Sequence, residues 1–510
     1  MAELHVGAGF ALKTLALAAA AAKSGDVVIV HAGVYAAGFR PPAGTTWVAA
    51  DAGQVVIDGG WKGGNLSPAD ANGYGVLVNQ RGVTMRGFEV RNIAGRGVVI
   101  GPGGDKFTLE DFEIHHTFSG GLACNGSGKP ITGIAIRRGH VHDISLSGRW
   151  RETPVSGCFL FKDANNLLVE DVLIERGRGE GIAAGFRSTG VVFRRVTVRD
   201  TTHLAMYVAN CATDVLVEDC VVYQTGAAEF RQHDGDVGAG FVIGDEVAEG
   251  RDDNRPRSEN VTMRRCVAVN CVQALQVRNG TKVKNGLLDG YDTRIQNLLV
   301  ERCTFVGGPE ARAGIGAGEN DQGAKVRGTI VSCVMAFDMM QPGGEQERVE
   351  PPGIVLAGNF WTAAVPAGLP ASNQAVRPAA LVAPLATVAD GFSIDNYRPV
   401  AGGPLDGAGI GALEPLPVEP PPVVDPPEPE PPPTPVDWDA LRVLAVTAAQ
   451  QLASAQANTA EAQKHTDGAA VLLNLSMLRL ADARQAQTDA MTQVAALLSA
   501  LDEATRSAAN

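Results

Sequence analysis

The chain has 510 residues, a formal net charge of -13 at pH 7 and a pI of about 5.2. Binding to nucleic-acid phosphates requires a basic stripe, so this acidic balance argues against a nucleic-acid partner. The 61 glycines, the 45% hydrophobic residues and the 19% charged residues favour short strands and tight turns over a helical enzyme.

The N-terminal segment predicts a helix from about 10 to 23, followed by a strand at 27–30. An amphipathic helix ahead of a stacked sheet would cover its open end, so we expect a capping helix. No basic region precedes an apolar one, so we expect no signal peptide and synthesis in a cytoplasm. The Ala-rich run 11–22 contains Lys13 and is too short to span a bilayer, so no membrane insertion is expected.

A repeat of roughly 24 residues then continues from about 75 to 340. One series of apolar residues occupies the same point of successive turns: Val98, Leu122, Cys158, Ile182, Met206, Phe241, Leu275 and Ile315. Small residues stand directly before them: Gly97, Gly121, Gly157, Gly181, Ala205, Gly240, Ala274 and Gly314. Repeats of this length cannot bury their apolar face alone, so the pattern predicts a solenoid of stacked short strands.

Four of the eight cysteines recur at a further point of the repeat: Cys220, Cys266, Cys303 and Cys333. Earlier turns have apolar residues there, so we expect an inward-facing stack of small apolar side chains. Metal ligation is the alternative, but no Cys-x-x-Cys pair accompanies these residues. We therefore expect no metal site and no cofactor, apart from a calcium ion that could order a loop.

Several segments resemble the right-handed parallel β-helix proteins, the group that includes pectate-lyase-like enzymes and phage tailspikes. They are Gly25 to Tyr35, Val56 to Gly60, Asn260 to Cys266 and Asp406 to Ala412. The resemblance covers 1 to about 413 and implies an all-β, right-handed, single-stranded parallel β-helix. We do not find the paired-Asp and His-Gly motifs of β-helix polygalacturonases or the basic motifs of pectate lyases, so no enzyme class carries over.

The composition changes in the C-terminal part of the chain. Twelve of the 24 residues from 414 to 437 are proline, which predicts an extended linker. From Leu452 to Thr505, steps of four and three residues trace a heptad seam, which predicts an α-helical coiled coil for oligomerisation or attachment. A helical hairpin hinged near Gly468 and a loosely ordered Ala-rich tail are the alternatives. Because tailspike β-helices usually assemble as trimers, the resemblance favours a homotrimer.

These changes divide the chain into five parts. We assign 1–74 to the cap and first turns, 75–340 to the regular β-helix with inserted loops, and 341–413 to its irregular closing segment. The Pro-rich linker is 414–437, and the helical segment is 438–510.

The repeat also predicts which side chains point outward from the first strand of each turn. The aromatic residues Phe159, Phe161 and Tyr207 fall at outward positions, with Gln276 and Arg278 further along. Aromatic faces stack on sugar rings, so this surface is a candidate carbohydrate-binding site. Burial of the rings under inserted loops is the alternative.

Long loops interrupt the repeat beside this surface, at 126–132, 145–156, 226–238, 245–259 and 279–294. Insertions on one side of a solenoid usually build a binding surface, so we expect the catalytic and sugar-binding residues here. A solvated loop with internal salt bridges, or a calcium site, is the alternative for the charged residues.

The charged loops allow two kinds of chemistry. Glycoside hydrolysis needs two carboxyl groups, which Asp234 and Asp236 could supply together with Glu180 or Asp245. A lyase needs a base and a cation, for which the candidates are His203, His233, Arg231, Arg251 and Arg278. Four other histidines lie at predicted strand ends and are expected to be turn residues: His115, His116, His140 and His142.

These predictions favour a tailspike or tail-fibre protein of a phage virion, made in the host cytoplasm. It would bind bacterial surface polysaccharide and could depolymerise it as a hydrolase or a lyase. Its other expected partners are copies of itself and other tail or capsid proteins. The alternatives are a non-enzymatic structural or adsorption protein of a virion, and a bacterial polysaccharide lyase or glycoside hydrolase.

Overall fold

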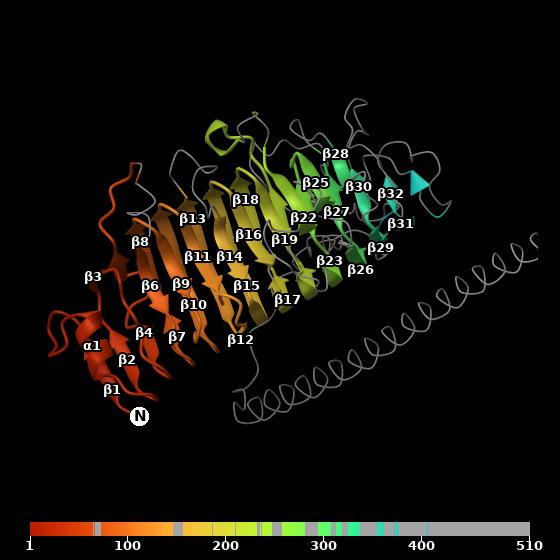
Figure 1. Cartoon of the computed structure of the whole chain (residues 1–510). Helices are drawn as coiled ribbons and strands as arrows, with labels where there is room; N and C mark the ends of the chain where they lie inside the picture. Colours follow the sequence, from red (N-terminus) through yellow and green to blue (C-terminus); the bar gives the residue numbers. More distant parts are fainter. Residues whose placement is uncertain are drawn as a thin grey trace, which may run out of the picture. The chain divides into compact units, whose positions relative to one another are not determined.

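The computed structural model divides into two units, Met1–Glu419 and Pro420–Asn510. It describes residues 1–64, 66, 73–145, 157–185, 187–209, 211–231, 235, 237–246, 258–280, 294–307, 313–318, 325–336, 354–357, 359–361, 372, 374–375 and 405. All of these lie in the first unit, so the Pro-rich linker and the heptad segment lie outside the described residues. The first unit is a parallel β-helix, as predicted (Figure 1).

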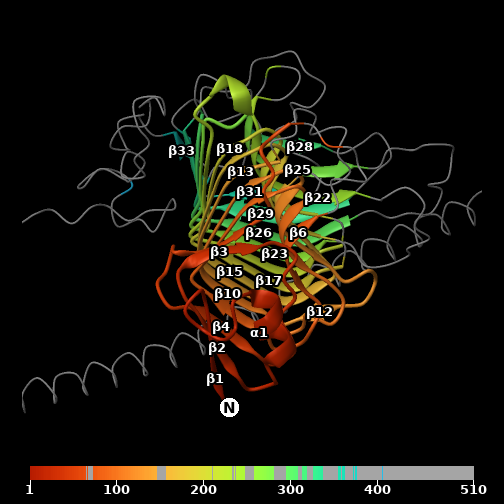
Figure 2. The same ribbon diagram turned by 90° about the vertical axis from the view of Figure 1, so that its left-hand side faces the viewer.

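From β6 onward the turns of the β-helix contribute to three faces, and the strands of successive turns pair in parallel register (Figure 2). The first face is a nine-stranded sheet. It consists of β6 (Tyr74–Val78), β9 (Arg96–Ile100), β11 (Gly120–Asn125), β14 (Gly157–Lys162), β16 (Glu180–Gly185), β19 (Leu204–Val208), β22 (Ala239–Glu246), β25 (Gln273–Gly280) and β28 (Ala313–Gly318).

The second face begins at the N-terminus and runs along the same axis. It contains β1 (Glu3–Val6), β2 (Val27–Val30), β4 (Thr46–Ala49), β7 (Thr84–Arg86), the first parts of β10 (Thr108–Thr117), β13 (Ala135–Ile144) and β15 (Ala164–Gly177), and then β17 (Thr189–Arg194), β20 (Thr213–Glu218), β23 (Glu259–Arg264), β26 (Arg294–Glu301), β29 (Lys325–Val331) and β31 (Ile354–Ala357). The short β12 (Ile131–Thr132) pairs with the start of β15.

The third face contains the second parts of β10, β13 and β15. Its other strands are β3 (Gly33–Ala36), β5 (Val55–Asp58), β8 (Phe88–Ile93), β18 (Thr197–Thr201), β21 (Val221–Tyr223), β24 (Val267–Val269), β27 (Thr304–Val306), β30 (Val334–Ala336), β32 (Phe360–Trp361) and β33 (Gln374–Ala375). Because β10, β13 and β15 run through the corner between them, the second and third faces form one continuous 24-stranded sheet.

One residue per turn, in the left-handed conformation, makes the corner between the second and third faces. The φ angle is +50° to +55° at Asp111, Arg138, Asp171, Arg195, Asp219, Arg265, Arg302 and Ser332. A similar corner ends the third face at Asn92, His116, Asp143, Arg176 and Asp200, where φ is +51° to +54°. L-residues adopt this conformation at a cost, so one residue bends the strand sharply without an intervening loop. The polar side chains next to each corner residue still point outward, away from the core.

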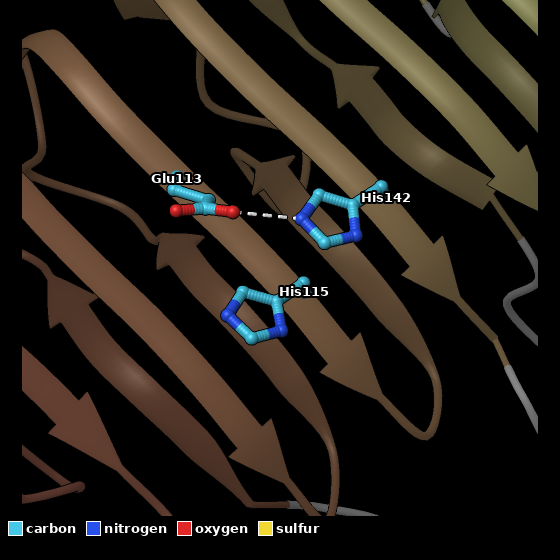
Figure 3. A group of neighbouring side chains, drawn as sticks. All are labelled: Glu113, His115 and His142. Carbon is cyan, nitrogen blue, oxygen red and sulfur yellow. Dashed lines mark hydrogen bonds and ion pairs between the residues drawn. The ribbon is translucent and has the colours of Figure 1, made fainter. Parts of the chain in front are cut away.

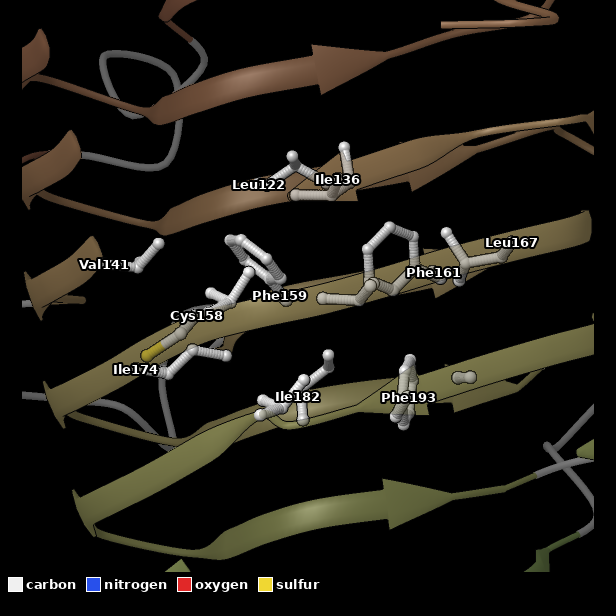
Figure 4. Close-up of a cluster of buried hydrophobic side chains, with 14 of the residues drawn as sticks. Leu122, Ile136, Val141, Cys158, Phe159, Phe161, Leu167, Ile174, Ile182 and Phe193 are labelled. Carbon is white, nitrogen blue, oxygen red and sulfur yellow. The ribbon is translucent and has the colours of Figure 1, made fainter. Parts of the chain in front are cut away.

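Alternate apolar side chains of all three faces fill the interior of the β-helix (Figure 4). In β14, Cys158, Phe159 and Phe161 are all fully inaccessible to solvent. The backbone pairs Phe159 with Leu122 and with Ile182, whereas the repeat predicted Cys158 at that point. The predicted register of this turn is therefore wrong by one residue, and in a strand such a shift exchanges the inner and outer sides.

The cysteine stack is confirmed. Cys220, Cys266, Cys303 and Cys333 are free and completely buried in successive turns. The backbone N–H of Cys303 donates to Sγ of Cys333 over 3.4 Å. Burial raises the pKa of the first three of these thiols well above its usual value, so they pack as small apolar side chains.

The predicted N-terminal helix is shorter than expected. The helix α1 (Leu15–Ala21) begins after Thr14, whose side chain accepts a hydrogen bond from the N–H of Leu17 at 3.2 Å. It buries Leu15 and Ala18 against the core. Among the described residues, no helix is both long and apolar enough to cross a membrane.

Candidate functional site

Polar side chains line the outer surface of the third face over several consecutive turns. Parallel register aligns one column of residues: Asp58, Arg91, His115, His142, Glu175, Arg199 and Tyr223. A second column contains Glu89, Glu113 and His140. Residues two apart in a strand share a side, so Glu113 and His115 on β10 face the same way as His140 and His142 on β13.

Three imidazole rings contact one another on these two strands, one pair stacked and the other tilted by 32°. The ring centroids of His115 and His142 lie 4.8 Å apart with an interplanar angle of 4°. Those of His140 and His142 lie 4.3 Å apart. We call His115, His140, His142 and Glu113 the histidine cluster. Figure 3 shows three of these residues, Glu113, His115 and His142.

His142 lies between two carboxylates. Its Nε2 donates to Oε1 of Glu113 at 2.8 Å, and its Nδ1 donates to Oδ2 of Asp143 at 2.7 Å. Burial of the ring opposes a positive charge, but the two hydrogen bonds outweigh it and raise the pKa of His142. Since a carboxylate can only accept, these two bonds fit a doubly protonated imidazolium, although Nη2 of Arg176 also lies 3.1 Å from Nδ1 and its charge partly opposes the rise in pKa.

His115 has a different environment. Its Nε2 lies 3.1 Å from Oε1 of Glu89, and its Nδ1 lies 2.6 Å from Nδ1 of His116. Two ring nitrogens in contact cannot both carry a hydrogen, so His115 donates from Nε2 and accepts at Nδ1. Burial of the ring lowers the pKa of His115, with a further contribution from the neighbouring charge of His142. A neutral imidazole therefore stacks on a charged one.

Glu175 anchors the far side of the cluster. Its side chain is only 4% exposed and accepts a hydrogen bond from Nε2 of His140 at 3.2 Å. Arg176 and Arg199 also contact its carboxylate. Burial alone would raise the pKa of Glu175, but the bond from His140 and the two guanidinium groups lower it to about 2.

A shallow depression of about 420 Å³ opens beside the cluster. Carboxylates, an imidazole, a guanidinium and apolar groups share its lining, which includes Glu89, Asp111, Glu113, Arg138, His140, Asp171 and Leu173. The side chains of Glu113 and His140 are 42% and 38% exposed, so the cluster opens to solvent on this side.

Alternating arginine and carboxylate side chains form one rim of the depression. Along the second face, next to the corner, parallel register stacks Arg86, Glu110, Arg137, Glu170, Arg194, Glu218, Arg264 and Glu301. The corner residues Asp111, Arg138, Asp171, Arg195, Asp219 and Arg265 alternate in the same way. We call these two columns the charge ladder. Opposite charges on neighbouring turns stabilise this register and disfavour a shifted one.

The ladder is hydrogen-bonded as well as charged. Nε of Arg138 donates to Oδ1 of Asp111 at 2.6 Å, and Nε of Arg195 donates to Oδ1 of Asp171 at the same distance. Each of these bonds lowers the pKa of the aspartate that accepts it. Both carboxylates at the rim are therefore ionised.

Three side chains of the described part of the chain could hold a metal ion. One potential ligand atom from each of Glu113, His115 and His142 lies within 4.8 Å of the other two. From the sequence we expected no metal site and assigned these histidines to turns. That assignment is wrong for His115, His140 and His142, which face outward from long strands, although His116 does occupy a corner.

The predicted sugar-stacking aromatics are not on the surface. Phe159 and Phe161 face the interior because the register of β14 differs by one residue from the predicted one. Tyr207 does face outward from the first face, but it is 4% exposed and packs in a separate apolar cluster with Ala183, Leu204 and Val242. Satellite-core packing, the alternative interpretation, is therefore correct for Tyr207.

The remaining predicted residues are scattered or lie outside the described residues. Glu180 and Gln276 are half-buried on β16 and β25 of the first face. Arg231 donates to the carbonyl oxygens of Gly226 and Gly235 at 3.2 and 2.8 Å, respectively. The backbones of His233, Asp234 and Asp236, and the side chains of Asp245 and Arg278, lie outside the described part, so the predicted catalytic set remains a prediction.

Residues 74–244, from β6 into β22, match the family model described as "Right handed beta helix region". This stretch is therefore similar to right-handed β-helix regions, which agrees with the predicted handedness, whereas the tailspike identity remains a prediction. No significant match exists among the curated proteins compared.

Several solved structures are similar to this chain at low identity. A structure of XylC with xylose is 12% identical over 73% of this chain and 86% of its own, with a TM-score of 0.46. Pectate lyase Pel9A is 16% identical over 82% of this chain and 97% of its own, with a TM-score of 0.42. PfbA, a surface adhesin of Streptococcus pneumoniae, is 8% identical over 68% of this chain and 82% of its own, with a TM-score of 0.38.

Proposed function

We propose that this chain binds a polysaccharide on the third face of its β-helix, in the depression beside Glu113 and His140. The observation that carries the proposal is the mixed lining of the depression. Ionised carboxylates and the guanidinium of Arg138 stand next to the apolar side chain of Leu173. A sugar presents hydroxyl groups at its rim and C–H groups on its faces, so it needs polar and apolar partners side by side.

The shape of the scaffold supports a polymeric ligand. Parallel pairing repeats polar side chains on the third face over several consecutive turns, at the strand spacing of about 4.8 Å. The polar rows extend from Asp58 on β5 to Arg199 on β18. An extended chain lying along the axis could contact several turns at once, which a single small sugar could not do.

The experiment measures binding of surface polysaccharide from candidate bacterial hosts by calorimetry. We expect His140→Ala to weaken binding about tenfold, the equivalent of about 1.4 kcal/mol. Gln276→Ala, on the first face, is the matched control and should leave the affinity unchanged. Loss of binding in the control with no effect of His140→Ala would move the site to the first face and contradict the proposal.

The same incubations would detect cleavage. A hydrolase releases new reducing ends, whereas a lyase produces an unsaturated product. Binding without either product would favour an adsorption protein over a depolymerase.

We also propose that the chain serves as a virion adsorption protein of the tailspike or tail-fibre type. Support for this part is confined to the sequence, in the Pro-rich linker at 414–437 and the heptad seam from Leu452 to Thr505. A coiled coil would tether several β-helices to one attachment point. The mass of the full chain in solution tests it, because a strict monomer would contradict the proposal.

We further propose that α1 covers the N-terminal end of the β-helix. Its buried residues Leu15 and Ala18 pack against the core next to β1, which supports this role. A sheet end without cover exposes unpaired backbone groups to pairing with other chains. Leu15→Asp should therefore increase concentration-dependent aggregation, which light scattering would measure.

A further inference from the structure

We infer that Glu113, His115 and His142 bind a divalent transition-metal ion of the zinc type, through one carboxylate and two imidazole ligands. The site requires no polysaccharide and is independent of the proposed function. It would add an ion at the edge of the depression, where Glu113 belongs both to the metal site and to the lining.

The backbone brings the three ligands together before any ion binds. Glu113 and His115 lie two residues apart on β10, and His142 lies directly opposite His115 on β13. The potential ligand atoms already lie within 4.8 Å of one another, and the pair formed by Glu113 and His142 is 2.8 Å apart. Tetrahedral coordination with Zn–N bonds of ~2.0–2.1 Å separates ligand atoms by roughly 3.4 Å. Side-chain rotations are therefore enough to complete the site.

Neighbouring side chains already hold the outer nitrogens of both imidazoles. Nδ1 of His142 donates to Asp143 at 2.7 Å, which leaves Nε2 directed at Glu113. A carboxylate–histidine–metal arrangement of this kind fixes the ring orientation and increases ligand basicity. His115 binds the ion through Nε2 once its hydrogen moves from Nε2 to Nδ1, where His116 lies 2.6 Å away and can accept it, and once Nε2 leaves Glu89. Figure 3 shows the ring of His115 beside those of its two partner ligands.

The ligand types select the ion. Calcium and magnesium prefer oxygen ligands, whereas imidazole nitrogen suits zinc, cobalt, nickel and iron. The nearby carboxylates of Glu89 and Asp143 would offset the charge of the ion. Three protein ligands leave a further coordination position open, and the 42% exposed side chain of Glu113 leads to it from solvent. A hydroxyl or carboxylate of a bound sugar could occupy that position.

The test uses the full chain without a polyhistidine tag, stripped with a chelator and titrated with Zn²⁺ and then Co²⁺. Calorimetry at pH 7.5 should show one strong site per chain, with proton release as His142 gives up the proton between Nε2 and Glu113. Co²⁺ should produce the visible absorption of a low-symmetry nitrogen-containing site, and excess Ca²⁺ should not displace it. An oxygen-only spectrum would exclude the imidazole ligands.

Variants separate the site from other histidines. Glu113→Gln and His142→Gln should each weaken Zn²⁺ binding about 100-fold, and Asp143→Asn about 10–100-fold, as loss of an outer-shell partner does. The matched control is His5→Gln with His31→Gln, which removes another histidine pair, in hydrogen-bond contact at 2.9 Å. This control variant should bind Zn²⁺ with the same affinity as the wild type.

The melting temperature of each variant without metal shows whether it still folds. If His142→Gln unfolds, Glu113→Gln replaces it in the test, because the side chain of Glu113 is partly exposed. Equal Zn²⁺ affinity in wild type and Glu113→Gln, or loss of the site in the His5/His31 control, would overturn the inference. Absence of a stoichiometric site in the wild type would overturn it too. None of these measurements involves polysaccharide, so failure here is distinguishable from failure of the proposed function.

Discussion

His142 bridges two turns of the β-helix to Glu113, with 2.8 Å between Nε2 and Oε1, while Asp143 holds its other nitrogen at 2.7 Å. The next ring in the stack, that of His115, has no such pair of carboxylates and faces Glu89 and His116 instead. Of these two stacked imidazoles, His142 therefore favours the protonated form and His115 the neutral form. Their titrations with pH should differ accordingly.

We expect the two histidines to titrate on opposite sides of the usual pKa of 6.5. The raised pKa of His142 means that its contribution to stability is complete below pH 6.5 and is lost as the pH rises through its folded-state pKa. The lowered pKa of His115 means that its contribution is complete above pH 6.5 and is lost as the pH falls. Two-dimensional NMR of the ring carbons as a function of pH would measure both.

Asp143→Asn is the matched variant for this titration. It removes a charge that raises the pKa of His142 but that makes no principal contribution to the pKa of His115. The titration of His142 should move to lower pH, and that of His115 should change less and in the opposite direction, because the neighbouring charge of His142 then lowers it less. A wild-type His142 that titrates below His115 would contradict the geometry described above.

The architecture could be predicted from the sequence because it depends on a repeated signal. Inward apolar residues at a regular spacing predict stacking, and the recurrence of Cys220, Cys266, Cys303 and Cys333 correctly predicted a buried column. Such signals tolerate an error in any one turn, since the neighbouring turns repeat them.

The aromatic site that the sequence predicted on the first face is wrong, because that prediction depended on the register of a single strand. The loop before β14 removes the period between Cys124 and Phe161, and Cys158 and Phe159 both fit an apolar position. Only the backbone pairing decides between them, and it places Phe159 inside. The histidines were wrongly assigned to turns for a similar reason. The sequence suggested that the strands end at the corner, but β10 and β13 continue through it.

One sequence signal could have indicated the histidine cluster. Glu113-Ile-His115 and His140-Val-His142 have the same alternation of polar and apolar residues, and both follow a charged corner residue, Asp111 or Arg138, by two residues. In stacked turns, such matching places the polar side chains side by side.

The register of β14 can be tested by a pair of truncations. Phe159→Ala should cost about 3–5 kcal/mol of unfolding free energy, because it leaves a cavity at a fully buried site. Leu160→Ala, on the outer side of the same strand, should cost about 1 kcal/mol. Urea unfolding curves would measure both, and a larger loss for Leu160→Ala would support the register predicted from the repeat.

A second core position allows a double-mutant test of the same turn. A Cβ atom added at Gly177 would lie 2.2 Å from Sγ of Cys158, so Gly177→Ala should destabilise the protein by about 1–3 kcal/mol. Cys158→Ala removes the sulfur and makes room for the added methyl group. In the double variant the loss should be clearly smaller than the sum of the two single losses. Additive losses would show that the two residues do not share this space.

The charge ladder predicts that its buried and exposed carboxylates differ in importance. Glu218 is 4% exposed and contacts the half-buried Arg194, Arg264 and Arg265, so Glu218→Gln removes a buried carboxylate that three guanidinium groups share and should cost about 1–3 kcal/mol. Asp171 is 41% exposed and pairs with Arg195, so Asp171→Asn should cost less than about 1 kcal/mol. Thermal and urea unfolding would compare the two variants on the same ladder.

The pH dependence of the ladder has a defined sign. Burial alone would raise the pKa of Glu218, but the hydrogen bonds from Arg194 and Arg264 lower it below its usual 4.5. The stabilisation is therefore complete above pH 4.5 and is lost as the pH falls through the folded-state pKa. Unfolding curves between pH 5 and pH 2 should converge for wild type and Glu218→Gln as the carboxylate becomes protonated. A constant difference in stability across this range would show that the charge of Glu218 contributes nothing.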